Sequence, residues 1–234
     1  MEKIQLSNIT TYLVGSSELS APEDCCSYLV TDNHGLSILI DVGAGNLISI
    51  KNLCDNIVTI HPLEQIKYVL ITHAHIDHVG GLMEMKSSYL VNARIIAHEY
   101  AAKIIRSEDP IRSAANWYQT KLNSTDIDIE ILQPYDIALT GGDFKVIPTP
   151  GHTPGSVVGL LDINNSQKRI IFGQDIHGPF MPEWESDMRQ WMKSMQIILN
   201  YAPDYLCEGH FGIIRGRENV KQFIRSYMSK FRLQ

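Results

Sequence analysis

Apolar residues recur along the chain with two different periods, and the changes of period predict the order of strands and helices. In the first third, short runs rich in β-branched and aromatic residues predict strands, and helical spacing of Leu and Ile follows them. We expect strands over residues 9–14, 27–31 and 36–41 and a helix over residues 46–57. The sequence from Asp32 to Gly35 is typical of a hairpin turn, so we interpret His34 as a turn residue.

The rest of the chain adds a second group of predicted strands. Residues 68–72 are continuously apolar, which predicts a strand buried on both faces. We expect further strands over residues 94–97, 143–147, 157–161 and 169–172, a short segment over 82–86, and helices over 98–106, 112–122, 187–199 and 217–231. Two groups of strands, each with its own helices, predict an α/β fold with two sheets packed face to face and helices outside. The expected fold is a four-layer αββα sandwich, and we interpret residues 1–234 as a single domain without a visible linker.

Composition and charge exclude several classes of function. The net charge of −6 argues against nucleic acid as a partner, and the basic residues near the C-terminus recur at the spacing of a solvated helix face. No signal-peptide pattern is visible, and no apolar run approaches the ~20 residues that span a bilayer, so we expect no membrane partner. The four cysteines form no CxxC pair, which favours a reduced, cytoplasmic setting.

A cluster of metal-binding residue types follows the predicted strand over 68–72. Three imidazoles and one carboxylate lie within six residues there: His73, His75, Asp77 and His78. Imidazole and carboxylate suit zinc, iron or manganese, whereas calcium and magnesium prefer shells made of oxygen alone. The cluster therefore predicts a transition-metal site.

Three later loops carry further candidates. His152 lies in a stretch too rich in Pro and Gly to be regular structure, Asp175 follows the predicted strand over 169–172, and His210 lies in a glycine-flanked turn. Taken singly, a loop histidine is usually a surface residue and an aspartate after a strand is usually a turn or cap residue. Loops at strand ends are nevertheless where a rigid scaffold can bring polar ligands together.

Together these motifs, in this order and spacing, resemble the metallo-β-lactamase superfamily over nearly the whole chain, from Leu39–Gly43 to Gly209-His210. The resemblance implies an αββα sandwich with two metal ions at one edge. It implies that His73, His75 and His152 hold one ion, that Asp77, His78 and His210 hold the other, and that Asp175 bridges them. It also implies that Asp41 accepts a hydrogen bond from a ligand histidine; the alternative is a turn residue at the end of a strand.

The local geometry agrees with this division of ligands. His73 and His75 are two residues apart on an expected extended segment, so their side chains can point to the same side, as can that of Asp77. His78 points differently and can serve a neighbouring ion.

The resemblance implies a binuclear metal-dependent hydrolase in which a hydroxide that bridges two divalent ions is the nucleophile. Zinc is the default metal, and iron or manganese fit the same ligands. Asp77 and Asp175 are the expected catalytic carboxylates, Asp77 as a proton relay to the leaving group. The expected partner is a small-molecule substrate: an ester, thioester, lactone or phosphoester. The alternative is a mononuclear or di-iron oxygenase or redox protein on the same fold. A third interpretation is a purely structural metal site. It is disfavoured because structural zinc usually takes four ligands, whereas this chain offers seven candidates.

Departures from the family's branches narrow this prediction. Asp175 with His78 resembles the glyoxalase II, lactonase and phosphodiesterase branches, whereas true β-lactamases lack a bridging Asp at that position. Gly178 stands where the lactonases have a substrate-contacting Tyr, and the 24 residues after His210 are too few for the helical domain of glyoxalase II. His177, two residues after Asp175, is an eighth residue close to the metal ions, a substrate-binding residue or an exposed loop histidine. Residues 99–126 form either a lid or a helix pair packed on the sheet, and the sequence leaves open whether the chain forms a homo-oligomer.

Overall fold

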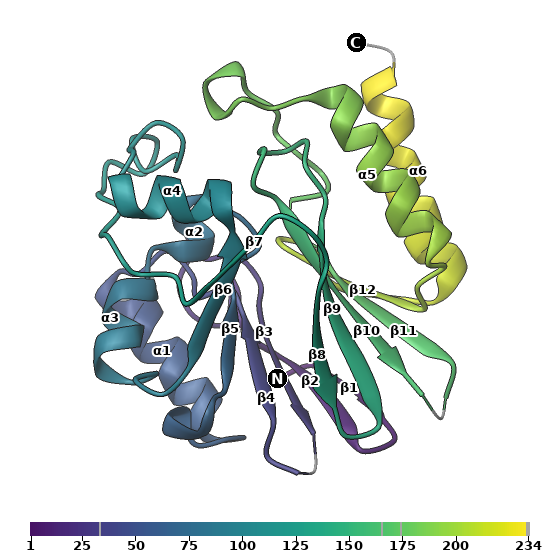
Figure 1. Cartoon of the computed structure of the whole chain (residues 1–234), viewed down its shortest axis with the longest axis horizontal. Coiled ribbons are helices and arrows are strands. Elements are labelled where there is room, and N and C mark those ends of the chain that lie inside the picture. The colour runs from purple at the N-terminus through teal and green to yellow at the C-terminus, as the bar shows by residue number, and fades with distance from the viewer. Residues whose placement is uncertain (33, 165, 174, 233–234) are drawn as a thin grey trace.

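The computed structural model describes residues 1–32, 34–164, 166–173 and 175–232. Within these ranges the strands form two mixed sheets that pack face to face in the middle of the molecule (Figure 1). The seven-stranded sheet follows the chain order, with β1 (Lys3–Leu6), β2 (Ile9–Gly15), β3 (Ser27–Asp32), β4 (Ser37–Ile40), β5 (Tyr68–Leu70), β6 (Arg94–His98) and β7 (Ile129–Ile131). The six-stranded sheet has the order β13 (Gly212–Arg215), β12 (Tyr205–Glu208), β11 (Lys168–Phe172), β10 (Val157–Ile163), β9 (Gly142–Pro148) and β8 (Tyr135–Leu139).

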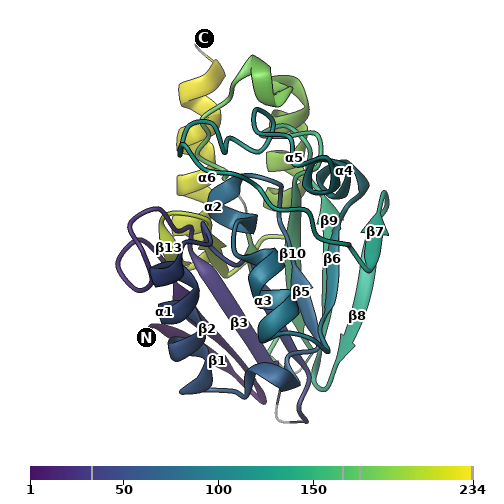
Figure 2. The same cartoon turned by 90° about the vertical axis from the view of Figure 1, so that its left-hand side faces the viewer.

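Helices cover the outer face of each sheet. On the first sheet lie α1 (Leu47–Val58), α3 (Leu82–Ser88) and α4 (Glu99–Ser107), which face the viewer in Figure 2 together with the single turn α2 (Ile76–Val79). On the second sheet lie α5 (Met188–Asn200) and α6 (Arg217–Arg232). The short 3₁₀ turns are η1 (Leu63–Gln65) and η2 (Pro182–Trp184). The predicted four-layer αββα sandwich is therefore confirmed.

Three apolar layers hold the sandwich together. In β3, Tyr28 and Val30 point into the core between the sheets, whereas Leu29 points into the core beneath the helices of the first sheet. Side chains alternate between the two faces of a strand, so a strand buried on both faces must be apolar throughout. Burial on both faces explains the run of apolar residues from Tyr28 to Val30 in the middle of β3. Trp191 of α5 and Ile224 of α6 belong to the third core, on the second sheet.

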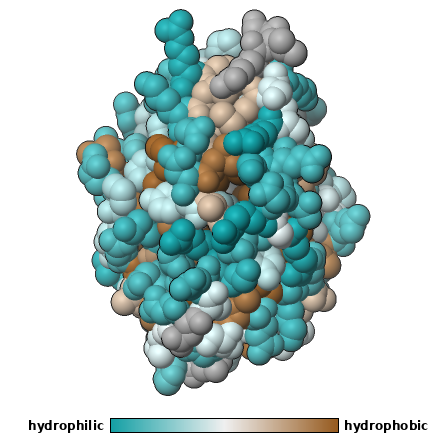
Figure 3. Space-filling view, turned by 90° about the vertical axis from the view of Figure 1, so that its right-hand side faces the viewer, coloured by the Kyte–Doolittle hydropathy of each residue, from teal (hydrophilic) through white to brown (hydrophobic). Residues whose placement is uncertain are grey.

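The exposed face of α5 and α6 is largely hydrophilic, with a small apolar area near its centre (Figure 3). Val220 and Ile224 of α6 are buried against the sheet, while Arg217 and Arg225 are exposed. The helix therefore has the predicted buried apolar face and exposed basic residues, while the absence of a partner on its basic face stays a prediction. No helix in the described part of the chain is both long enough and apolar enough to cross a membrane.

The predicted helix over residues 112–122 is wrong, because this segment is a series of turns. The Asp109 carboxylate accepts hydrogen bonds from the backbone N–H groups of Ile111 and Arg112, which start a helical turn. The chain then reaches Ala114 with φ of 56°, in the left-handed region, and this conformation ends the turn. The other predicted helices are confirmed within one or two residues, as are the predicted strands at their cores.

The structure also bears on the predictions for the cysteines, the hairpin turn and the number of strands. The four cysteines are free, as expected, and all four are buried. The cytoplasmic setting inferred from them stays a prediction. The predicted hairpin turn includes residue 33, which lies outside the described residues. On either side of it, Asp32 Oδ1 accepts from the backbone N–H groups of His34 and Leu36. The strands β1, β7, β8, β12 and β13 were not predicted.

The candidate ligands lie at one rim of the sandwich because the loops that carry them meet there. Val157 N–H at the start of β10 donates to Thr72 O (2.8 Å), which ties the second sheet to the loop after β5. On the other side of that loop, Val42 N–H donates to His78 O (2.8 Å). Gly45 has φ of +81°, and a Cβ there would lie 2.2 Å from the Gly80 carbonyl carbon. Only glycine allows the two backbones to approach so closely.

Candidate metal centre

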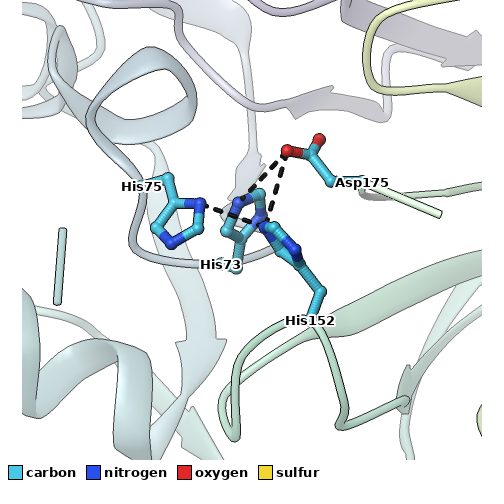
Figure 4. Close-up of side chains that lie close together, drawn as sticks. All are labelled: His73, His75, His152 and Asp175. Atoms are coloured by element: carbon cyan, nitrogen blue, oxygen red, sulfur yellow. Dashed lines mark hydrogen bonds and ion pairs between the residues drawn. The ribbon is translucent and has the colours of Figure 1, made fainter. Parts of the chain in front are cut away.

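The first group of possible ligands surrounds one point at the rim. His73, His75, His152 and Asp175 are all buried, and each offers a ligand atom within 4.8 Å of the others. Figure 4 shows the three rings and the carboxylate turned toward one another. His75 Nδ1 lies 3.0 Å from His152 Nε2, and Asp175 Oδ2 lies 3.5 Å from His152 Nε2 and 3.9 Å from His73 Nε2.

Hydrogen bonds on the far side of two rings fix which nitrogen faces this point. His152 Nδ1–H donates to Pro179 O (2.9 Å), and Thr72 Oγ1 lies 3.2 Å from His73 Nδ1. The Thr72 hydroxyl donates to Asp41, so it accepts from His73 Nδ1–H. Such contacts orient metal-binding histidines and set their tautomer. In both rings Nε2 is left to face the centre.

The second group lies beside the first and is more open. Asp77, His78, His210 and Asp175 again offer ligand atoms within 4.8 Å of one another. His78 Nε2 and His210 Nε2 lie 3.1 Å and 3.2 Å from Asp175 Oδ1, and His210 Nε2 lies 3.3 Å from Asp77 Oδ2. Three of these side chains are buried, whereas 30% of the His210 side chain is exposed.

Asp175 belongs to both groups through different oxygens. Its Oδ2 faces His73 and His152 of the first group, and its Oδ1 faces His78 and His210 of the second. This is the arrangement that a bridging carboxylate requires.

Asp41 is the hydrogen-bond acceptor for His78, with His78 Nδ1 2.7 Å from its Oδ2. Its carboxylate also accepts from the Thr72 backbone N–H (2.8 Å) and the Thr72 hydroxyl (2.7 Å). Asp41 follows β4 with φ of 56°, so it ends a strand and contacts a candidate ligand at the same time. The two interpretations from the sequence are therefore compatible.

The electrostatics of the two groups differ. Burial lowers the pKa of His75 and of His152 to about 3, so both rings are neutral and carry free lone pairs. Burial also opposes protonation of His210, but the Asp175 carboxylate outweighs it and raises the pKa of His210 to about 10. Although burial disfavours its ionised form, His78 and His210 hold the pKa of Asp175 well below its usual range.

These side chains fit divalent transition-metal ions. His73 Nε2 is buried without a hydrogen-bond partner in the described part of the chain, which is costly unless another group satisfies it. The donors are imidazole nitrogens and carboxylate oxygens, a set that suits zinc, iron or manganese. Because His210 is protonated when no ion is bound, metal binding there would release a proton.

Aromatic side chains form the wall of a small pocket beside both groups. The cavity has a volume of about 140 Å³, and Asp77, Asp175 and His210 contribute to its lining. The Trp184 ring lies 4.3 Å from that of His75 and 4.6 Å from that of Trp117. Trp184 is itself buried, so it packs its loop onto the protein and at the same time lines the pocket.

The structure corrects one detail of the sequence reasoning and adds two residues to it. Asp77 does not continue the extended segment of His73 and His75, because Ile76–Val79 forms the turn α2, and this turn points Asp77 toward His210. Cys25 lies with Asp41 and His78 in a further buried group, and burial raises the pKa of its thiol to about 12. Glu208, next to the glycine before His210, is fully buried beside the site. The sequence carried no signal for either role.

Comparison with known proteins identifies the family. A model of the metallo-β-lactamase superfamily matches residues 21–165. The chain belongs to this superfamily. Superfamily members are metal-dependent hydrolases, and the His and Asp groups at the rim indicate the use of a divalent metal.

Individual relatives agree with that assignment. The chain is 28% identical to the probable metallo-hydrolase YybB of Bacillus subtilis over 69% of this chain and 72% of the relative. It is 28% identical to a hydroxyacylglutathione hydrolase of Rhodopseudomonas palustris over 50% of this chain and 40% of that protein. Among solved structures, a metallo-β-lactamase of Cronobacter sakazakii has a TM-score of 0.79 at 19% identity, covering 97% of this chain and 91% of that one. The last likeness shows the fold alone.

Proposed function

We propose that the protein is a binuclear metal-dependent hydrolase of a small ester, thioester, lactone or phosphoester, with zinc as the resident metal. The observation that carries the proposal is the position of Asp175, whose two oxygens face two different groups of buried nitrogen and oxygen donors. A purely structural zinc site would need four ligands and no shared carboxylate.

The ligand side chains have distinct tasks in this proposal. His73, His75 and His152 would hold one ion, Asp77, His78 and His210 would hold the other, and Asp175 would contact both. When bound, the ions would supply an activated water and polarise the carbonyl or phosphoryl oxygen of the substrate. Asp77 lies at the pocket with its Oδ2 3.3 Å from His210, where it could carry a proton toward the leaving group.

The pocket supports a small reacting group. A cavity of about 140 Å³ is well below the ~300 Å³ or more of typical sites that enclose a whole drug-sized ligand. Trp184, which is buried, and Trp117 narrow it and keep bulk water from the face of His75. We therefore expect the scissile bond to enter the pocket while the remainder of the substrate stays outside.

The relatives support the same class of chemistry. The name hydroxyacylglutathione hydrolase denotes a thioester hydrolase, and thioesters are among the proposed substrates. Hydrolysis of β-lactam antibiotics is not part of the proposal, because Asp175 departs from the pattern of that branch.

Metal analysis combined with a substrate panel tests the proposal. The purified protein, reconstituted with zinc, would be assayed on chromogenic esters, thioesters, lactones and phosphodiesters, together with Asp175→Ala. Asp143→Ala, which changes an exposed carboxylate on β9, is the matched control. We expect two zinc ions per chain, a colourless protein, and activity that Asp175→Ala abolishes and Asp143→Ala preserves. One ion per metal-replete chain, or hydrolysis that survives Asp175→Ala unchanged, would contradict the proposal.

A further inference from the structure

Glu208, at the end of β12, joins two of the loops that carry candidate ligands. Its side chain is fully buried, and both of its carboxylate oxygens are used. Oε1 accepts from the Ile176 backbone N–H (3.2 Å) and faces His177 Nδ1 (3.0 Å). Oε2 accepts from the backbone N–H groups of His210 (2.7 Å) and Phe211 (3.1 Å).

A carboxylate in this position dictates the tautomer of His177. An ionised carboxylate can only accept hydrogen bonds, and the two backbone groups on Oε2 can only donate them. Nδ1 of His177 must therefore carry the proton that it shares with Oε1. In the neutral ring this leaves a lone pair on Nε2.

The remaining nitrogen of His177 is available to a ligand. His177 lines the same pocket as Asp77, Asp175 and His210, and 21% of its side chain is exposed. Among the residues that the structure describes, Nε2 has no hydrogen-bond partner. The ring lies 5.2 Å from that of His210, so a group bound at Nε2 would be close to the second group of ligands.

We propose that Glu208 is a positioning residue that holds His177 with its Nε2 lone pair toward the pocket, where it accepts a hydrogen bond from a hydroxyl or amide N–H group of the substrate. This inference rests on the proposed hydrolase function and restricts its substrates to those with such a donor near the scissile bond. His177 also contacts the rings of Phe211 and Tyr227, and a purely structural role for it would consist of this packing.

Two variants separate the hydrogen bond from the packing. His177→Phe keeps an aromatic ring against Phe211 but removes both nitrogens. Glu208→Gln keeps the shape of the side chain but replaces one acceptor oxygen by an NH₂ donor. Two backbone N–H groups, of His210 and Phe211, need an acceptor on one side of the amide and only that of Ile176 needs one on the other, so we expect the amide oxygen to stay on the side of His210. The NH₂ group then faces His177 Nδ1 and stabilises the opposite tautomer. His34→Phe, at an exposed histidine in a distant hairpin, is the matched control.

The tautomer is measured by ¹⁵N NMR of histidine-labelled protein, both zinc-loaded and metal-free. We expect the proton of His177 on Nδ1 in wild type and in His34→Phe, and on Nε2 in Glu208→Gln. A wild-type ring that is protonated on Nε2, or a tautomer that Glu208→Gln leaves unchanged in a folded protein, would overturn the positioning role. This measurement needs no turnover, so it separates a failure of this inference from a failure of the proposed function.

The contact with a ligand is measured with hydroxyacetate and methoxyacetate, two small acids that differ in one hydrogen-bond donor. Their dissociation constants for the zinc-loaded protein would be read from the His177 signals and, in His177→Phe, from those of His210. Chelation by the α-oxygen is common to all variants, so only the ratio of the two constants is compared. We expect the preference for hydroxyacetate to fall roughly fivefold in His177→Phe, the value of one neutral hydrogen bond, and to be unchanged in His34→Phe. The substrate contact would be overturned if the ratio of the two dissociation constants were the same in wild type and in His177→Phe. It would also be overturned if neither acid changed the chemical shifts of His177 in the wild-type protein.

Discussion

The two groups of candidate ligands share Asp175 but provide different surroundings for an ion. The first is made of three imidazoles that burial keeps neutral, with pKa values for His75 and His152 of about 3. The second contains two carboxylates and His210, whose pKa of about 10 marks it as a cation when no metal is bound. It is also the group that reaches the exposed side of the pocket. We infer that the first position binds its ion more tightly and the second exchanges its ion more readily.

The largest expected difference is in kcat/KM, between a variant that loses a ligand of the first group and a variant that loses a ligand of the second. We expect His152→Ala to lower kcat/KM on the order of 10³-fold, because it opens the buried group and several kcal/mol of charge stabilisation depend on a held ion. We expect His210→Ala to lower it on the order of 10²-fold, because the exposed position can be completed by water. Steady-state kinetics with zinc in excess would measure both. A larger loss for His210→Ala would reverse the proposed ranking.

A smaller effect should follow from Asp41→Asn, which acts on one group only. His78 Nδ1–H and the Thr72 backbone N–H face different oxygens of Asp41, and an amide has only one oxygen. If that oxygen stays on the backbone N–H, the NH₂ group faces His78 Nδ1–H and the ring loses its orientation. We expect the affinity of the second ion to fall about 10- to 100-fold, while the first ion is unaffected. Competition with a chromophoric chelator would resolve the two constants. Equal weakening of both ions would show that the groups are not independent.

The smallest expected effect is the pH dependence of stability in the metal-free protein. The folded-state pKa of His152, about 3, lies below the ~6.5 of an unfolded histidine, so its neutral ring contributes fully above pH ~6.5. This contribution is lost as the pH falls toward 3. His210 has the opposite sign: with a pKa of about 10, its contribution is present below pH ~6.5 and is lost as the pH rises through 10.

Urea unfolding of metal-free variants would separate these contributions. We expect His152→Leu to flatten the loss of stability between pH ~6.5 and about 3, and His210→Leu to flatten the loss on the alkaline side. If the free energy of unfolding of both variants changed with pH in the same way as that of wild type, the difference in charge between the two groups would be contradicted.

The same comparison shows which parts of the site the sequence could predict. His73, His75, Asp77 and His78 are close together in the chain, directly after an apolar strand, so composition and spacing alone indicated a metal. His152, Asp175 and His210 come from three separate loops, and only the family resemblance connected them. The structure brings all seven to one rim.

Other features depend on contacts between distant segments and had no local signal. The left-handed conformation of Ala114 replaced the predicted helix over 112–122 by turns. In the sequence, Glu208 cannot be told from an exposed charged residue. Its burial depends on four N–H donors that two different loops supply. The strand β3 was easier to predict, since burial on both faces requires the apolar residues from Tyr28 to Val30 at its centre.

Titration of the metal-free protein with zinc, followed by calorimetry and by elemental analysis of the product, tests the central claim most directly. The shared carboxylate of Asp175 predicts two binding steps of unequal affinity and two ions per chain in wild type, and loss of at least one ion in Asp175→Ala. A single step that ends at one ion per chain, or two ions retained after Asp175→Ala, would contradict it.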